Sequence, residues 1–507
     1  MRKVLAVLLL ALSLTAPAQQ RAVSRADDAP GRVQRYIDIV MTGSALKGSS
    51  VGVVAVKANG DTVVAYNGDK RLIPASNTKL ITTGLALKEL GSDYRFETSL
   101  GYTGTIEDGV LKGDLYIVGG GDPTLGTKDS IATPLNTLFA RWKQFLTEAG
   151  IRRIEGRVVG DGRYFDGPIE KDGWSYQDIG TYYGAGGNGL SFYRNILDIQ
   201  VAAGAKVGDP VKVTPSYPEL PWMQYSSTAL TSAKGTGDKL YLFNTDLAPV
   251  AQMRGTFAID RQPKKEECSN KFGAMTCAHY FRNYLNSNGI RVLEIADVDA
   301  EGQLRSPDFE ILGAAADSVT TLGSTLSPTA RQIAFITNMR SDNFYAETLY
   351  RALSRKQKGS ADYEAAREAE SAALKRLGLD PAQVRIVDGS GLARDNWISP
   401  DFFCTFLRKM MDTSVYKDFL GTLASPGTPG SYSARLQNEA KDLKERIFYK
   451  SGSMEGVRCY SGYIVPASGQ EEDTIVFSVM VNNCTSESWQ HLPVVDKIIA
   501  LIALENI

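Results

Sequence analysis

Histidine is almost absent from this sequence. The 507 residues contain two histidines, His279 and His491, and each stands alone. A Ser-His-Asp triad needs a histidine that faces both a serine and a carboxylate, so the sequence does not favour hydrolysis by that arrangement. The sequence also has no CxxC and no HExxH motif, which leaves almost no ligands for a catalytic metal. We therefore expect neither a metal nor a cofactor.

An excess of charge of one sign is also lacking. Lys and Arg number 56 and Asp and Glu number 57, so the net charge is -1. No basic stripe is present, so we expect no nucleic-acid partner. The most apolar late stretch, residues 494–504, is interrupted by Asp496 and Lys497, so we expect no transmembrane segment in the mature chain. The oligomeric state stays open.

The N-terminus has the pattern of a secretory signal peptide. Arg2 and Lys3 precede an apolar run over residues 4–14, and residues 16–18 (Ala-Pro-Ala) provide a small-x-small cleavage site. A membrane helix needs about 20 apolar residues, and this run is shorter. We expect residues 1–18 to be removed and the mature protein to be exported to the periplasm or another extracytoplasmic space.

Five cysteines in an exported chain could form two disulfides and leave one over. Cys268 and Cys277 lie close together in a polar stretch, and Cys459 and Cys484 lie at opposite ends of a predicted two-stranded hairpin. Cys404, among phenylalanines, is expected to be a small buried hydrophobic residue. Two alternatives stay open for the other four: the disulfides Cys268–Cys277 and Cys459–Cys484, or unpaired cysteines.

Apolar periodicity predicts one sheet built from two distant parts of the chain. A helix over residues 33–41 precedes two strands over 51–58 and 62–66, and another helix begins near Ser76. Later elements are helices over residues 329–339, 343–353 and 362–377, strands over 446–449, 459–465 and 474–481, and a closing helix over 492–504. We expect an α+β fold, an α/β sandwich in which helices flank a five-stranded antiparallel sheet.

The stretch between these two parts, residues 98–314, has a different composition and different periodicity. Gly, Pro and Tyr are frequent there, and short strand patterns alternate with turns such as residues 119–123. We expect an inserted β-rich body, while residues 19–97 and 315–507 form the two parts of one catalytic domain. The candidate catalytic residues all lie outside the insertion, so we expect it to select substrates and not to take part in bond breaking.

Because the sequence does not favour histidine as the catalytic base, lysine is the candidate. Burial and nearby cations can lower the pKa of a lysine enough to leave a neutral amine. A Ser-x-x-Lys sequence on a helix places both side chains one turn apart on one face. The pattern begins at Ser44, Ser76 and Ser414. Only Ser76 follows a Pro-Ala step into a helix start and precedes an apolar helix that would bury Lys79. Taken alone, Ser76 would more simply be a helix N-cap.

Two further motifs follow in order along the chain. Ser341-Asp342-Asn343 opens the helix predicted after the insertion, and Lys450-Ser451-Gly452 ends a strand. Ser-x-x-Lys, Ser-Asp-Asn and Lys-Thr-Gly together are typical of penicillin-binding proteins and β-lactamases. Ser341 can pass a proton to a leaving amine, and Asn343 can hold a substrate amide. Lys450 and Ser451 can bind a terminal carboxylate.

The end of the third motif completes the expected site. Gly452 would leave room for a substrate to lie along the strand edge. The backbone N–H groups of Ser76 and Ser453 would form the oxyanion hole.

The three motifs and the size of the insertion resemble the class C low-molecular-mass penicillin-binding proteins, the D-alanyl-D-alanine carboxypeptidase/endopeptidase family (penicillin-binding protein 4 type). The third motif departs from the usual Lys-Thr-Gly of the family by a serine, which keeps the hydroxyl. Further family-like stretches are residues 120–125, 161–166, 173–174, 183–185, 388–392, 454–457 and 461–463.

The resemblance implies a β-lactamase/transpeptidase-like domain and a serine-type D-Ala-D-Ala carboxypeptidase or endopeptidase. Its substrates would be peptidoglycan stem peptides, its intermediate an acyl-enzyme on Ser76, and its covalent inhibitors β-lactam antibiotics. The resemblance also implies an insertion carboxylate that meets the distal amine of the stem, for which Asp161 is the best match. An acidic turn residue before Gly162 is the alternative for Asp161.

Two other functions remain open on the same fold. A serine β-lactamase would need a base that deacylates the ester quickly, and no Glu-bearing loop is evident for that task. A non-catalytic penicillin-sensing or wall-binding protein would not need the full set of chemical residues that this chain has.

Overall fold

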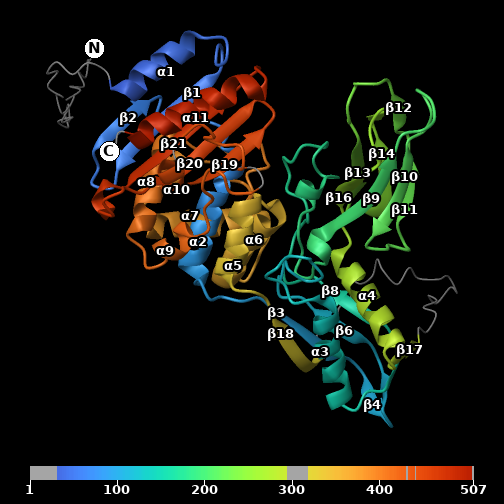
Figure 1. The fold of residues 1–507 in the computed structure, drawn as a ribbon. Helices are drawn as coiled ribbons and strands as arrows, with labels where there is room; N and C mark the ends of the chain where they lie inside the picture. The colour runs from blue at the N-terminus through green and yellow to red at the C-terminus, as the bar shows by residue number, and fades with distance from the viewer. Residues whose placement is uncertain (1–30, 294–317, 430–431, 440, 505–507) are drawn as a thin grey trace, which may run out of the picture.

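The computed structural model describes residues 31–293, 318–429, 432–439 and 441–504 (Figure 1). The expected signal peptide, residues 1–18, and the expected end of the insertion at residue 314 lie outside the described residues. Figure 1 shows two bodies. One contains the first and last described helices, α1 and α11, side by side, and the other extends away from it and is built from the middle of the chain.

Strands from both ends of the chain form one sheet in the first body, which we call the catalytic body. The order is β19-β20-β21-β1-β2, and every neighbouring pair is antiparallel. The five-stranded antiparallel sheet expected from the sequence is confirmed. Its strands are β1 (Ser50–Lys57), β2 (Thr62–Tyr66), β19 (Ile447–Met454), β20 (Val457–Ile464) and β21 (Ile475–Asn482).

Helices cover both faces of this sheet, which is why β21 is buried along its whole length. Val53 and Val479 pack with α1 and α11, while Val54 and Met480 face the opposite helices, which include α2 and α8. The helices of this body are α1 (Arg32–Thr42), α2 (Thr78–Leu90), α5 (Ala330–Arg340), α6 (Asn343–Lys358), α7 (Tyr363–Arg376), α8 (Pro400–Met411), α9 (Tyr416–Leu420), α10 (Lys441–Glu445) and α11 (Ser488–Leu504).

The described strands between residues 97 and 326 belong to other sheets and form the second body, the insertion. Glu97 of β3 pairs with Leu326 of β18, so the chain leaves and rejoins the catalytic body at neighbouring points. The part nearest these strands contains β3 (Glu97–Tyr102), β4 (Thr105–Glu107), β5 (Val110–Lys112), β6 (Leu115–Val118), β7 (Arg153–Glu155), β8 (Val158–Asp161), β17 (Arg291–Leu293) and β18 (Thr320–Leu326).

A second group of strands in the insertion has its own hydrophobic core, which includes Leu242 and Phe257. It lies above the first group in Figure 1, in green. Its strands are β9 (Ile196–Ala202), β10 (Lys212–Tyr217), β11 (Gln224–Ser227), β12 (Leu230–Ser232), β13 (Tyr241–Thr245), β14 (Ala248–Arg254), β15 (Thr256–Ala258) and β16 (Lys264–Ser269).

The insertion also contains two helices that the sequence analysis did not anticipate, α3 (Leu135–Glu148) and α4 (Gly273–Ser287). Buried residues recur at helical spacing in α3, among them Leu138, Trp142 and Phe145. The high Gly, Pro and Tyr content reflects the turns and strands around these helices. Within the described residues, no helix combines the length and the apolar character needed to cross a membrane.

All five cysteines are free and buried, so neither disulfide considered from the sequence is formed. Cys268 and Cys277 belong to different hydrophobic clusters. Cys459 lies opposite Met480 in the β20–β21 pair, which leaves Cys484 beyond the end of the ladder. Cys404 is buried, as expected. The cysteines act as small hydrophobic residues in this fold.

Candidate active site

The turn that carries Ser76 is tight and strained. Residues Ala75–Asn77 form a short 3-10 helix, η1, and α2 follows directly. Ala75 has a φ of 47°, a left-handed conformation, which costs an L-residue roughly 1–2 kcal/mol. Asn77 Nδ2 donates to Ser461 Oγ of β20 at 2.8 Å, and this bond ties the turn to the sheet.

The Lys79 amine contacts the Ser76 hydroxyl one turn later, with Nζ 2.9 Å from Oγ. Lys79 is completely buried. In the two other Ser-x-x-Lys sequences the lysines, Lys47 and Lys417, are exposed. Of the three pairs, Ser76 and Lys79 are therefore the one whose amine is withdrawn from water.

The Lys79 amine also lies near two oxygens that only accept hydrogen bonds. Asn343 Oδ1 is 2.6 Å away and the Ser390 carbonyl oxygen is 2.7 Å away. Asn343 Nδ2 donates to the Tyr183 carbonyl at 2.9 Å, and this contact fixes the orientation of the amide. A neutral amine has two N–H bonds to donate and one lone pair. It therefore donates to these two oxygens and directs its lone pair at the Ser76 hydroxyl.

The surroundings of Lys79 favour that neutral amine. Burial, followed by the positive charge of Lys450, lowers the pKa of Lys79 to about 7. The carboxylates of Glu347, Asp388 and Asp342 act in the opposite direction. A large fraction of Lys79 is therefore neutral at pH 7.

The Ser390 carbonyl belongs to a loop that two buried carboxylates hold in place. Glu347 of α6 accepts the N–H groups of Ser390 at 2.7 Å and Gly389 at 3.1 Å. Asp388 accepts a hydrogen bond from the insertion, from Trp174 Nε1 at 2.9 Å. This loop lies in one of the family-like stretches of the sequence, but its contact with the lysine depends on tertiary packing.

The second motif places Ser341 beside a different lysine. Ser341 has a φ of 58° at the end of α5, and Lys450 Nζ lies 2.9 Å from its hydroxyl oxygen. Lys450 of β19 is completely buried, and burial lowers its pKa to about 7. Ser341 and Asn343 are two positions apart, yet one contacts Lys450 and the other contacts Lys79, because the left-handed turn separates their directions.

The third motif packs directly against the turn that carries Ser76. A Cβ atom at Gly452 would lie 2.4 Å from the Pro74 carbonyl oxygen and 3.1 Å from the Ser76 nitrogen. The glycine therefore makes room for this turn, whereas the sequence analysis assigned that room to the substrate. Ser451 Oγ lies 3.3 Å from Tyr432 Oη. Tyr432 was not identified from the sequence because it belongs to no motif.

Some of these groups, Ser76, Ser341 and Asn343, border a cavity of about 870 Å³ between the two bodies, whereas Lys79 and Lys450 lie behind its lining residues. Residues of both bodies line it. The catalytic body contributes Ser76, Ser341, Asp342, Asn343 and Ser453, and the insertion contributes Ser175, Gln177, Asp178, Tyr182, Tyr183 and Arg194. We call residues 175–183 the insertion wall.

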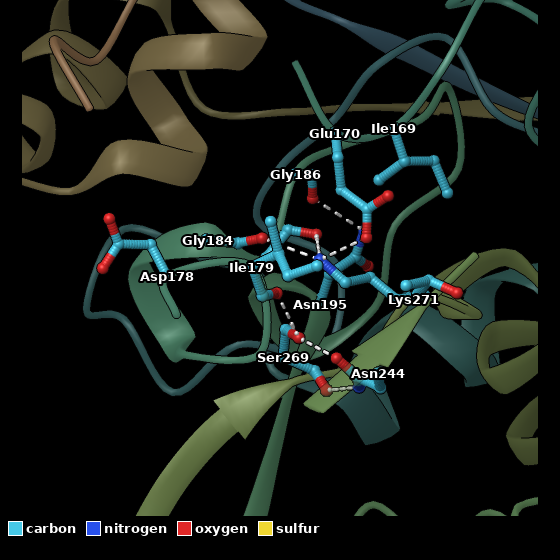
Figure 2. A network of polar contacts seen from close by, with 12 residues as sticks. Ile169, Glu170, Asp178, Ile179, Gly184, Gly186, Asn195, Asn244, Ser269 and Lys271 are labelled. Carbon is cyan, nitrogen blue, oxygen red and sulfur yellow. Dashed lines mark hydrogen bonds and ion pairs between the residues drawn. The ribbon is translucent and has the colours of Figure 1, made fainter. Parts of the chain in front are cut away.

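A buried polar network supports the backbone of the insertion wall (Figure 2). Lys271 is almost completely buried, and its Nζ donates to the Gly184 carbonyl at 2.7 Å and pairs with Glu170 Oε1 at 3.0 Å. Ser269 Oγ donates to the Ile179 carbonyl at 2.9 Å. The backbone is thus fixed on both sides of the turn between residues 179 and 184, which positions the side chains that the wall presents to the cavity.

Asp161, the expected contact of the stem amine, is not among the residues that line this cavity. It is buried at the end of β8, where its carboxylate accepts the Arg163 N–H at 3.0 Å and pairs with Arg163 Nη2 at 2.9 Å. This is the geometry of the alternative, a structural turn residue. The insertion carboxylate that does line the cavity is Asp178, whose pKa burial raises.

The fold and this geometry are those of serine hydrolases that place a lysine beside the nucleophile. The model of the D-Ala-D-Ala carboxypeptidase 3 (S13) family matches residues 33–493, so the chain belongs to that family. It is a serine-type D-Ala-D-Ala carboxypeptidase, and the β-lactamase and non-catalytic alternatives are set aside.

Curated relatives and a solved structure agree with this assignment. The chain is 27% identical over 468 residues to a D-alanyl-D-alanine carboxypeptidase of Actinomadura sp. (strain R39), covering 88% of this chain and 80% of the relative. It is 23% identical to D-alanyl-D-alanine carboxypeptidase DacB of Haemophilus influenzae, covering 85% of each. Penicillin binding protein 4 (dacB) from Haemophilus influenzae has the same fold, with a TM-score of 0.76, 22% identity, and coverage of 93% of this chain and 98% of that chain.

Proposed function

We propose that this carboxypeptidase cleaves peptidoglycan stem peptides through an acyl-enzyme on Ser76, with neutral Lys79 as the base. The observation that carries the proposal is the contact of Lys79 Nζ with Ser76 Oγ at 2.9 Å, while two acceptor-only oxygens take the other hydrogen bonds of the amine. A base in this geometry can take the serine proton directly.

Acylation then transfers the peptidyl group to the serine. Ser76 Oγ attacks the carbonyl carbon of the penultimate D-Ala as its proton passes to Lys79. The C–N bond breaks, and the proton that Lys79 took from Ser76 passes through Ser341 to the nitrogen of the terminal D-Ala, which leaves as an amine. Lys450 contacts the Ser341 hydroxyl and keeps its own proton. Backbone N–H groups of Ser76 and Ser453 stabilise the oxyanion. Hydrolysis returns the enzyme when water attacks the ester carbon, gives a proton to neutral Lys79, and Lys79 passes that proton to Ser76 Oγ as the ester C–O bond breaks.

Lys450 and Ser451 bind the carboxylate of the terminal D-Ala. Burial lowers the pKa of Lys450 to about 7, and a bound carboxylate favours the charged form of a buried lysine. Binding of the carboxylate therefore favours protonation of Lys450, and protonated Lys450 binds the carboxylate more tightly. Ser451 adds a hydroxyl donor beside Tyr432.

The insertion wall selects the substrate through Asp178. This carboxylate lines the cavity, and Tyr183 Oη donates to its Oδ1 at 3.2 Å. A free amine on the distal part of the stem fits a carboxylate at this position. Asp178 thereby takes the task that the sequence analysis assigned to Asp161.

Inhibition by β-lactams and location outside the cytoplasm complete the proposal. Penicillin binding protein 4 of Haemophilus influenzae, which shares the fold, has been solved in complex with a β-lactam. A β-lactam would acylate Ser76 as the peptide does. The basic and apolar start of the sequence supports export to the periplasm or another extracytoplasmic space, where stem peptides are found.

Labelling with a fluorescent penicillin followed by peptide mapping tests the nucleophile. Label should appear on the peptide that contains Ser76 and be lost in Ser76→Ala. Ser414→Ala is the matched control, since Ser414 begins a Ser-x-x-Lys sequence whose lysine is exposed, and it should label like the wild type. Label on another serine, or undiminished label in Ser76→Ala, would remove the assignment.

A further inference from the structure

A strained turn of the insertion reaches the second catalytic motif. Tyr193, Arg194 and Asn195 have consecutive φ values of 52°, 56° and 51°. None is a glycine, and successive left-handed residues are rare in L-polypeptides. The surroundings enforce this conformation. The Tyr193 N–H donates to the Leu125 carbonyl at 2.8 Å, and Asn195 Nδ2 donates to the Gly186 carbonyl at 3.2 Å (Figure 2).

The strained turn presents Arg194 to a buried carboxylate of the catalytic body. Arg194 Nη2 lies 2.5 Å from Asp342 Oδ2, and the Asp342 side chain is only 1% exposed. The other oxygen of Asp342 accepts the Tyr345 N–H at 3.0 Å and caps α6. Asp342 is the central residue of the second motif, and a buried carboxylate without a partner would be strongly unfavourable there. Strain maintained by its surroundings is a mark of functional sites.

The insertion also contacts residues that flank the motif and a second residue of the motif itself. Asp129 pairs with Arg340, the residue before Ser341, and also accepts the Tyr345 hydroxyl at 2.6 Å. The Tyr183 carbonyl accepts Asn343 Nδ2 at 2.9 Å. The insertion therefore contacts residues on both sides of Ser341. Ser341 itself has a left-handed backbone conformation that directs its side chain toward Lys450.

We propose that the insertion holds the second motif in its reactive geometry and that Arg194 is the positioning residue through which it does so. The proposal rests on the function proposed above. It departs from the expectation that the insertion only selects substrates, because loss of Arg194 would slow bond breaking even for a small ligand that does not reach the insertion wall.

The charge of Arg194 gives the proposal a signature in the pH dependence. The charged groups that act on Lys79 are Lys450 on β19, Glu347 on α6, Asp388 in the following loop, and Asp342 at the start of α6. Arg194 neutralises Asp342, which otherwise favours the charged form of Lys79. Without Arg194 the pKa of Lys79 should rise, because the charge of Asp342 is no longer neutralised. The acid limb of the acylation rate should therefore move to higher pH.

The experiment measures the second-order rate of acylation by a small fluorescent penicillin across pH. Arg194→Met should be at least about tenfold slower at pH 7, with its acid limb moved to higher pH, and Arg194→Lys should recover part of the rate. Asp342→Asn keeps the helix cap and removes the charge, so its acid limb should move to lower pH. Arg194→Met should then reduce the acylation rate less in the Asp342→Asn background than in the wild type.

Arg163→Met is the matched control. Arg163 is also an arginine of the insertion that pairs with a buried carboxylate, Asp161, but this pair lies away from the second motif. It should acylate like the wild type, and melting temperatures check folding of every variant. Unchanged acylation and an unchanged acid limb in Arg194→Met would overturn the proposal. So would an equal loss in Arg163→Met, or a defect of Arg194→Met confined to KM for peptides. A wild type that penicillin does not label at Ser76 would refute the proposed function instead.

Discussion

Replacing Lys79 by arginine separates its role as a base from its positive charge. The pKa of about 7 leaves roughly half of Lys79 neutral at pH 7, whereas an unperturbed lysine is neutral to the extent of on the order of one in 10³. Arginine stays protonated in proteins, so Lys79→Arg loses this lone pair altogether. We expect acylation to fall by about 10³-fold, which corresponds to about 4 kcal/mol of activation free energy.

The assay is the second-order rate of acylation by fluorescent penicillin under single-turnover conditions. Lys450→Arg is the comparison, because it changes the other completely buried lysine of the site by the same substitution. Its neighbours, Ser341 Oγ and the Ser451 carbonyl, can accept from a guanidinium. We expect a loss of about tenfold there, mainly from the larger side chain.

Two results would refute this division of tasks. Equal losses in the two variants would show that Lys79 is not distinguished from Lys450 by its lone pair. A Lys79→Arg enzyme that keeps most of its rate at pH 7 would show that a neutral amine at this position is not required.

Three further predictions follow from the site. The pH profile of kcat/KM should be bell-shaped with both limbs near pH 7, since acidification protonates Lys79 and alkalinisation discharges Lys450; a flat profile between pH 6 and pH 8 would contradict this. Gly452→Ala should slow acylation and lower the melting temperature, at a cost of about 1–3 kcal/mol, because its Cβ would press on the nucleophile turn; wild-type values would argue against that contact. Asp178→Asn should weaken turnover of a stem peptide with a free distal amine but leave acylation by a small penicillin unchanged, whereas Asp161→Asn should not separate the two substrates; a parallel fall in Asp178→Asn would assign it a structural role.

The catalytic body could be predicted from the sequence because its signals are local. Strands with apolar runs, turn residues between them and helix periods predicted the five-stranded sheet and most of the flanking helices, but not α8, α9 and α10. The strand expected over residues 446–449 continues to Met454, so Lys450, Ser451 and Gly452 lie within β19 and not at its end. The helices of the insertion were missed, since the surrounding Gly, Pro and Tyr residues dominated the composition on which that prediction depended. Pairing of the cysteines was left open, and the register of β20 and β21 excludes one of the two pairs.

The sequence by itself determined which chemistry is available. Two histidines leave lysine as the candidate base, and the order of Ser76, Ser341 and Lys450 along the chain identifies the three motifs. These conclusions need only residue identity and short spacing, because one helical turn brings Ser76 and Lys79 together.

Tertiary structure alone decided which lysine each motif contacts and how the insertion takes part. Ser341 turns to Lys450 because of a left-handed backbone conformation, and the Ser390 carbonyl reaches Lys79 from a loop far along the chain. Asp178 and Arg194 line the cavity beside Ser76 because the insertion folds against the catalytic body, while Asp161 is buried against Arg163. Contacts between residues so far apart in sequence depend on the packing of whole bodies, and no local pattern specifies them.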